Sequence, residues 1–246
     1  MSSSPFGDRV HRLGPGVAAG MSLGISDVLG KIVLTGGVDV VSMLLFRSIV
    51  GLLFVATWFR FGHKPTATPA VRIVSLTVGI IFAGLIFCLF EAIETIDVPT
   101  AVLSYFTYPI LTGLTAAVAG IELVCAVAAF SGLALLIDAH PAGFVITGVV
   151  YAVAATCSRT AVLLITRAYL VGADARLTTW YSMLSSTAVF IAIAFTAQTW
   201  NMPHSALNWI WLVTLSFATT AAILFIFLST VRIGAFRTAV IMHLEP

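Results

Sequence analysis

Charge is scarce in this chain. Only 9% of its 246 residues are Asp, Glu, Lys or Arg, whereas 60% are hydrophobic and the mean hydropathy is +1.09. A soluble domain carries about 25% charged residues, and one core of this length cannot hide so much apolar surface. The composition excludes a soluble domain and predicts a polytopic membrane protein that contacts the lipid bilayer directly.

Cysteine is scarce as well. The 3 cysteines, Cys88, Cys125 and Cys157, lie singly in three apolar segments, with no CxxC spacing. This pattern excludes a disulfide framework and a cysteine metal site. The sequence also has no HExxH pair and no spaced Cys/His ligand set, so we predict no metal, no cofactor, no catalytic residue and no enzyme activity. The basic residues are spread over several loops, which argues against a nucleic-acid partner.

Long apolar segments of Leu, Val, Ile, Ala and Phe make up most of the chain, each close to the ~20 residues with which a helix crosses a bilayer. Their length indicates an all-α bundle and not a barrel of short alternating strands. Residues 1–15 are polar and are expected to form a cytoplasmic tail, not a cleaved signal. The predicted spans are 16–37, 40–61, 73–93, 100–119, a fifth that ends near Ile137, 143–166, 177–197 and 207–231, and a ninth begins after Arg237.

An internal repeat relates the two halves of the chain. Residues 89–109 align without a gap on residues 226–246, 137 positions later, and the alignment pairs Ile96 with Ile233. Both segments contain the end of the third span of a half, a short turn and the start of the fourth span. The agreement between period and span order predicts two homologous halves.

Lysine and arginine in short loops favour the cytoplasmic side of a membrane. With the N-terminus inside, the outer loops contain no Lys or Arg, and the basic residues that remain, Lys31, Arg47 and Arg159, lie within spans. Five spans per half is an odd number, so the second half enters the membrane with the opposite orientation. Inverted repeats of this kind are typical of secondary transporters, whose sites lie near the midplane at the repeat interface.

The chain resembles the EamA-type transporters of the drug/metabolite transporter superfamily in several short motifs and in the order in which they occur. The matching motifs are Phe46-Arg47 in the second span, residues 101–109 in the fourth, Gly120-Ile121-Glu122 followed by Gly132 in the fifth, and Leu244-Glu245-Pro246 in the ninth. The resemblance implies ten helices in two inverted five-helix repeats, which we place at residues 16–138 and 139–246. On this alignment we expect the second repeat to be truncated in helix nine, with about thirty residues of the family pattern missing.

Charges inside the spans are the main candidates for a substrate site, because a charge on a lipid-facing helix costs about 2.5–3.5 kcal/mol and is expected to face the bundle interior. Lys31 follows Asp27 by four residues on one helix face, so mutual neutralisation and a ligand role both stay open. Arg47 is expected either to snorkel outward in a structural role or to contact substrate. Arg159 has no acidic neighbour at helical spacing, and we predict that it binds an anionic group, with Lys31 opposite.

Aromatic and titratable side chains complete the predicted site. Tyr105, Tyr151 and Tyr181 offer amphipathic surfaces to a substrate cavity. His243 and Glu245 would enter the bundle on the ninth span, and both titrate in ways that suit proton coupling.

These features predict a secondary transporter that moves a small polar metabolite, such as an amino acid, across a bacterial inner membrane by alternating access. Export is implied by the family resemblance. The alternative is a non-transporting membrane protein, either an incomplete paralogue or a fragment of a ten-helix carrier, that assembles as a homodimer or with a partner subunit. An intramembrane enzyme is disfavoured, because the sequence offers no catalytic set.

The asymmetry of Lys and Arg predicts the topology. In a background with Cys88, Cys125 and Cys157 replaced, single cysteines at Lys64 and His204 should react oppositely with a membrane-impermeant thiol reagent applied to intact cells. We expect labelling at position 204 and protection at position 64 until the membrane is permeabilised. Labelling of position 64 from outside would overturn the orientation.

Overall fold

The computed structural model describes residues 5–61, 66–96, 98–115, 127, 131, 145–197 and 201–242, and its regular structure within these ranges is α-helix. The helices are α1 (Pro5–Thr35), α2 (Val40–Phe61), α3 (Pro69–Thr95), α4 (Val98–Tyr105), α5 (Tyr108–Thr115), α7 (Ile146–Tyr169), α8 (Ala175–Ala197), α9 (Ala206–Ile233) and α10 (Ala235–Met242). The fold is therefore the all-α fold that the sequence predicts.

Six of these helices are long and apolar enough to cross a membrane: α1 from Leu13 onward, α2, α3, α7, α8 and α9. They coincide with six of the predicted spans to within a few residues, as expected of a helical membrane protein. The first helix begins earlier than predicted, because the polar tail continues it back to Pro5. The predicted fifth span lies almost entirely outside the described residues.

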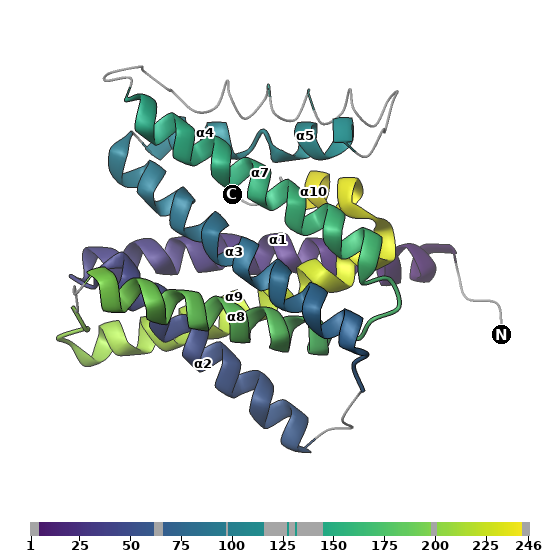
Figure 1. Ribbon diagram of the computed structural model, residues 1–246, viewed down its shortest axis with the longest axis horizontal. Helices are drawn as coiled ribbons and strands as arrows, with labels where there is room; N and C mark the ends of the chain where they lie inside the picture. The colour runs from purple at the N-terminus through teal and green to yellow at the C-terminus, as the bar shows by residue number, and fades with distance from the viewer. Residues whose placement is uncertain are drawn as a thin grey trace.

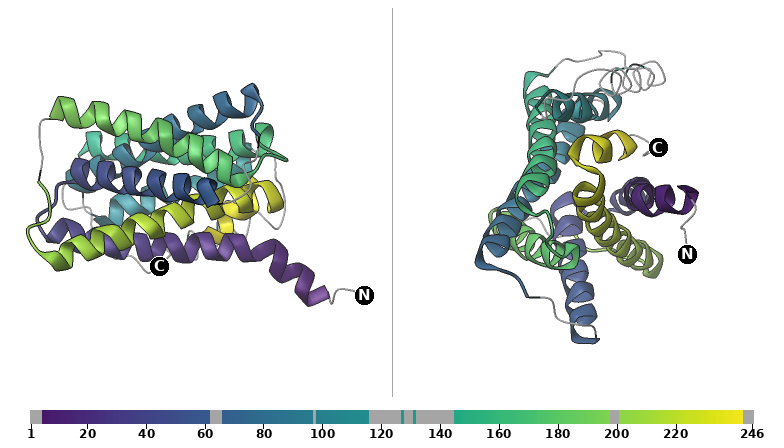
Figure 2. Two further views of the ribbon diagram at one scale, coloured as in Figure 1. Left: turned by 90° about the horizontal axis from the view of Figure 1, so that it is seen from below. Right: turned by 90° about the vertical axis from the view of Figure 1, so that its right-hand side faces the viewer.

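The long helices lie roughly along one direction (Figures 1 and 2). In Figure 1, α1, α2 and α3 run in directions opposite to α7, α8 and α9, respectively. α1 packs along α9, α3 lies between α7 and α8, and α2 packs against α8 and α9. Every long helix of the first half thus packs on long helices of the second half.

Apolar side chains fill the space between the helices in several clusters. One cluster, around Leu44 and Leu212, joins the start of α2 to the start of α9 and to α1 and α8. A second cluster, around Phe82 and Phe227, lies between α3, α8 and α9. A third surrounds Tyr108 and includes residues of α7, α9 and α10. The core is therefore formed mainly by contacts between the two halves.

Hydroxyl groups of α8 hold it close to α3. Ser182 donates to the carbonyl of Ser75 (2.9 Å), and Ser186 donates to the carbonyl of Gly79 (2.7 Å). Ser185 donates to the carbonyl of the residue that follows Ser75 (2.8 Å). Small residues allow helix backbones in a membrane to approach closely, and serine adds a donor for the neighbouring main chain. The pair α3–α8 therefore forms a tight, hydrogen-bonded contact.

The loop between α1 and α2 is bonded to the second half. The Asp39 carboxylate accepts from the N–H of Ser42 (3.0 Å), which caps α2, and from the N–H of Asn201 (2.8 Å). The Asn208 side chain of α9 donates to the Gly36 carbonyl (3.2 Å). Partial burial alone would raise the pKa of Asp39, but the hydrogen bonds outweigh it and hold the pKa below its ordinary value.

The predicted fourth span, 100–119, is not one continuous helix. It is broken between Tyr105, where α4 ends, and Tyr108, where α5 begins. Pro109 explains the break, because it has no N–H to donate to the Tyr105 carbonyl and its ring would collide with that carbonyl in a continuous helix. Thr156 of α7 donates instead to the carbonyls of Ser104 (3.0 Å) and Tyr105 (3.2 Å). The break is thus stabilised by a neighbouring helix, as a membrane protein requires.

We expect Gly79→Ala to destabilise the protein by roughly 2 kcal/mol, because the new Cβ would overlap the Ser182 carbonyl and the Ser185 hydroxyl and push α8 away from α3. The measurement is the thermal unfolding midpoint of the purified protein in detergent. Gly84→Ala is the matched control on the same helix, since no atom lies within 4 Å of its new Cβ. Equal midpoints for the two variants would contradict the close contact.

We expect Thr156→Val, which keeps the side-chain shape and removes the donor, to cost about 1 kcal/mol by leaving the carbonyls at the break without this bond. The same unfolding assay measures it. Thr196→Val is the control, because the exposed Thr196 hydroxyl donates only within its own helix, to the carbonyl of Ile193 (2.8 Å) and, more weakly, to that of Ala192 (3.3 Å). A larger loss in Thr196→Val would contradict the assigned role of Thr156.

Candidate functional site

Arg47 lies inside the bundle, where α2 meets α3, α8 and α9. Its side chain is 8% exposed and borders an internal cavity. The cavity offers about 20 Å³ to the centres of water molecules, which is room for about one water. Its wall is formed by Arg47, Ser48, Phe82, Ser182, Met183, Ser186, Phe190, Thr219, Ile223 and Phe227. The predicted outward snorkelling of Arg47 is wrong, because the packing of α8 and α9 on α2 encloses the side chain.

The hydroxyl groups of this wall are largely committed to other partners. Ser48 donates to a carbonyl of its own helix (2.8 Å), and Ser182 and Ser186 donate to carbonyls of α3. Thr219 shares a hydrogen bond of 2.7 Å with Ser26 of α1. Because these hydroxyls donate elsewhere, the N–H donors and the full positive charge of the Arg47 guanidinium are what the wall offers to a ligand. The cavity therefore suits a small group with negative charge.

The wall of the cavity contains no carboxylate among its residues, all of which are described. Asp27 on α1 contributes an electrostatic attraction to the Arg47 guanidinium, although the Asp27 side chain is itself exposed. An opposite charge of this kind lowers the cost of burying the cation. Since the wall holds no carboxylate, the guanidinium can meet a ligand from the side of the cavity.

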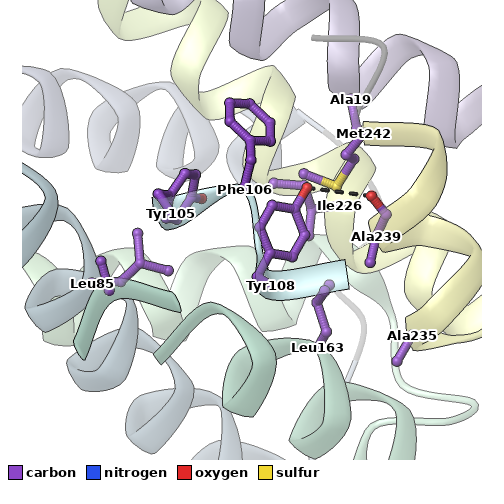
Figure 3. Packing of buried hydrophobic residues seen from close by; sticks show 11 residues of the cluster. Ala19, Leu85, Tyr105, Phe106, Tyr108, Leu163, Ile226, Ala235, Ala239 and Met242 are labelled. Atoms are coloured by element: carbon purple, nitrogen blue, oxygen red, sulfur yellow. Dashed lines mark hydrogen bonds between the residues drawn. The ribbon is translucent and has the colours of Figure 1, made fainter. Parts of the chain in front are cut away.

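Arg159 lies in a separate cluster, between α7, the α4–α5 break and α10. It is 2% exposed, its guanidinium carbon is 5.5 Å from the centre of the Tyr108 ring, and its Nη2 is 3.7 Å from the sulfur of Met242. Figure 3 shows the surroundings of Tyr108, whose hydroxyl donates to the Ala239 carbonyl (3.3 Å). The predicted interior position of Arg159 is confirmed. Its contacts to an aromatic face and a thioether are those of a packed cation.

The remaining predicted site residues do not converge on one cavity. Tyr105 is buried beside Tyr108, with 5.4 Å between the ring centres, and so belongs to the Arg159 cluster. Tyr151 packs on the apolar cluster around Ala101 and Ala152. Tyr181 lies near the start of α8, where the Arg72 guanidinium stands 6.0 Å from its ring centre. The placement of these tyrosines thus separates them from the Arg47 cavity.

Lys31 and Asp27 lie on an exposed face of α1. The expectation that every charge within a span faces the bundle interior is therefore wrong for both residues, because α9 and α10 pack on other faces of α1. Lys31 does not lie opposite Arg159, which is buried on α7. His243 and Glu245, the predicted coupling residues, lie outside the described residues.

The serine and threonine residues of the cavity wall were not predicted as site residues. A signal for them exists in the sequence, since Ser182, Ser185 and Ser186 recur at spacings of three and four in an apolar segment, which places them on one helix face. The interface is therefore visible in the sequence as a polar stripe. No comparable stripe marks Thr219, the wall residue from α9, because α9 contains hydroxyl residues on several faces.

Similarity to known proteins is confined to the fold. No protein-family model and no curated protein matches this chain. Solved structures include 16 chains that resemble it. One of these, described only as a crystal structure of a protein, has a TM-score of 0.73 and 17% sequence identity, over 96% of this chain and 84% of that chain. At this identity the likeness shows a shared fold and carries no activity across.

Proposed function

We propose that the chain is a transmembrane carrier of a small polar metabolite with a carboxylate or another anionic group, and that Arg47 binds this group. The observation that carries the proposal is the position of Arg47, a buried cation beside a cavity between two helices of each half. An ionisable residue inside a membrane bundle is costly to maintain, and such residues commonly mark substrate or ion pathways. A planar guanidinium is also well suited to hold a carboxylate with two hydrogen bonds.

An inverted repeat is the architecture we propose for this carrier. Moving the bounds of α3 by 137 positions places its start, Pro69, on Ala206, where α9 starts. The same shift carries α4, with its ends at Val98 and Tyr105, onto α10. The packing pattern supports the repeat as well, because exchanging the halves converts the contact of α1 with α9 into that of α7 with α3. The opposite directions of the paired helices in Figure 1 support the inversion.

Alternating access follows from this architecture. The cavity is lined by α2 and α3 of the first half and by α8 and α9 of the second half. With room for about one water, it cannot take up a metabolite until these helices separate. A rocking motion of one half against the other would open it first to one end of the bundle and then to the other. We propose that this conformation is a closed intermediate of the cycle.

Membership of the EamA-type transporters of the drug/metabolite transporter superfamily remains our proposal for the family. Its support in the described residues is the Phe46-Arg47 pair. Phe46 packs edge-on against Trp209 of α9, with 5.3 Å between the ring centres, while the next side chain turns into the cavity. The pair thus combines a contact between the halves with a buried cation, which gives the motif a physical role.

A bacterial inner membrane and a cytoplasmic N-terminus are proposed on the distribution of charge. Described basic residues occur at the helix ends on the side where Figure 1 marks the N-terminus: Arg60, Arg72, Arg167, Arg176, Arg232 and Arg237. The opposite ends, around the α1–α2 and α8–α9 connections, contain no described Lys or Arg beyond Lys31. The distribution favours the N-terminal side as cytoplasmic.

The second candidate is a non-transporting membrane protein. The Arg159 cluster is the observation that favours it, because a cation packed on Tyr108 and Met242 is well explained by a structural role. The two candidates differ in what the Arg47 cavity binds. A carrier must bind its metabolite there, whereas a structural protein binds none.

Arg47→Ala should reduce transport at least about thirtyfold, since losing a buried charged partner costs roughly 2 kcal/mol or more. The assay is counterflow of radiolabelled amino acids and other small carboxylates in proteoliposomes, with a substrate first identified for the wild-type protein. Arg47→Lys should retain part of the activity, because an ammonium keeps the charge and loses the bidentate fork. Arg60→Ala, an exposed residue at the end of the same helix, is the matched control.

The same assay distinguishes the role of Arg159 from that of Arg47. The variants to compare are Arg159→Lys and Arg159→Ala. If Arg159 binds substrate as the sequence predicts, Arg159→Lys should weaken transport, and Arg159→Ala should weaken it more with unchanged membrane insertion. Unchanged transport in Arg47→Ala would overturn the proposed site. No counterflow or ligand-induced stabilisation by any carboxylate in the wild-type protein would favour the structural alternative.

A further inference from the structure

Half of the residues that line the Arg47 cavity are apolar: Phe82, Met183, Phe190, Ile223 and Phe227. They belong to α3, α8 and α9, so they face the cavity from both halves of the chain. Each of them is at most 7% exposed and is therefore packed closely on its other sides. The Arg47 guanidinium thus borders a space whose walls are largely apolar.

The cavity lies where two apolar clusters meet. Phe190 belongs to the cluster around Leu44 and Leu212, which reaches the α1–α2 connection. Phe82 and Ile223 belong to the cluster between α3, α8 and α9, which reaches the start of α8 near the other end of the bundle. In the proposed cycle the space beside Arg47 therefore grows between apolar side chains, whichever end opens. A ligand that extends away from the guanidinium meets these side chains.

The cavity wall offers no opposite charge to an ammonium group. None of its residues is acidic, and the exposed Asp27 is not among them. The wall hydroxyls can accept a hydrogen bond, but they are neutral. An amino acid whose carboxylate pairs with Arg47 would hold its ammonium close to the guanidinium, and burying a charge without an opposite partner is costly. A second carboxylate would be unpaired too, since Arg47 is the one basic residue of the wall.

We propose that the site selects monocarboxylates with an apolar remainder and no amino group, and that Ile223 and the other apolar wall residues determine this specificity. The inference rests on the proposed function, because it assigns the carboxylate to Arg47. An apolar remainder gains free energy when it leaves water for such surroundings, and it places no unpaired charge beside the guanidinium. The proposed substrates are therefore polar only at their carboxylate, which excludes amino acids.

Three related ligands test this specificity on the wild-type protein. Isocaproate has one carboxylate and an apolar remainder, and L-leucine adds an ammonium to the same skeleton. Glutarate carries a second carboxylate at the far end of a main chain of the same length. In calorimetric titrations of the purified protein in detergent, isocaproate should bind at least about tenfold more tightly than the other two. Titration of the Arg47→Ala protein measures partition of each ligand into the detergent.

The possible outcomes separate the specificity from the proposed function. Binding of leucine or glutarate as tight as that of isocaproate would overturn the specificity and leave Arg47 as the carboxylate site. If none of the three ligands bound the wild-type protein more tightly than the Arg47→Ala protein, both the carboxylate site and its specificity would be overturned.

Ile223→Thr tests the part played by the apolar wall, because it keeps a branched side chain and replaces the ethyl branch with a hydroxyl. The measured quantity is the ratio of the affinities for isocaproate and acetate. Both ligands place a carboxylate on Arg47, so the ratio isolates the contacts of the apolar remainder. The ratio should fall at least about threefold in Ile223→Thr.

Ile210→Thr is the matched control, since Ile210 lies on the same helix and is 58% exposed. Its ratio should equal that of the wild-type protein. Equal ratios in the two variants would overturn the assignment of Ile223. If Ile223→Thr does not fold, the three-ligand comparison on the wild-type protein still decides whether the site has this specificity.

Discussion

The structure depends on one constraint, which is that hydrocarbon supplies no hydrogen bonds to a polar group. The protein meets this constraint by pairing hydroxyl side chains of one helix with carbonyls of another. Thr156 does so at the interruption caused by Pro109, and Ser182 does so between α8 and α3. These bonds stabilise local irregularities and also fix which helices are neighbours. The same contacts thus satisfy the polar groups and determine how the helices are arranged.

The contacts also explain where a charged group can be kept. Arg47 is enclosed because two helices of the second half pack across α2, and the remaining space beside it is small. Arg159 is enclosed differently, beside an aromatic ring and a thioether. Two buried cations in one bundle therefore have different surroundings, one suited to a ligand and one to packing. This contrast is the reason for treating Arg47 as the primary site.

Much of the fold could be predicted from the sequence, because bilayer thickness fixes the length of a span. The predicted span 40–61, for example, has the same first and last residues as α2. The break at Pro109 was missed, since hydropathy does not register a single missing N–H. The direction of side chains could not be predicted either. Spans that are apolar on all sides give no periodic signal, so the enclosure of Arg47 and the exposure of Lys31 became apparent only from the packing of whole helices.

The connection that Asp39 makes to Asn201 has a consequence for the resting state of the proposed carrier. Together with the bond from Asn208 to Gly36, it joins the two halves at the end of the bundle that contains the α1–α2 and α8–α9 connections. Opening that end requires both bonds to break, which at about 1 kcal/mol each amounts to roughly a thirtyfold bias in the conformational equilibrium. The unloaded protein would then wait with this end shut, and the free energy of substrate binding would have to supply the difference before release.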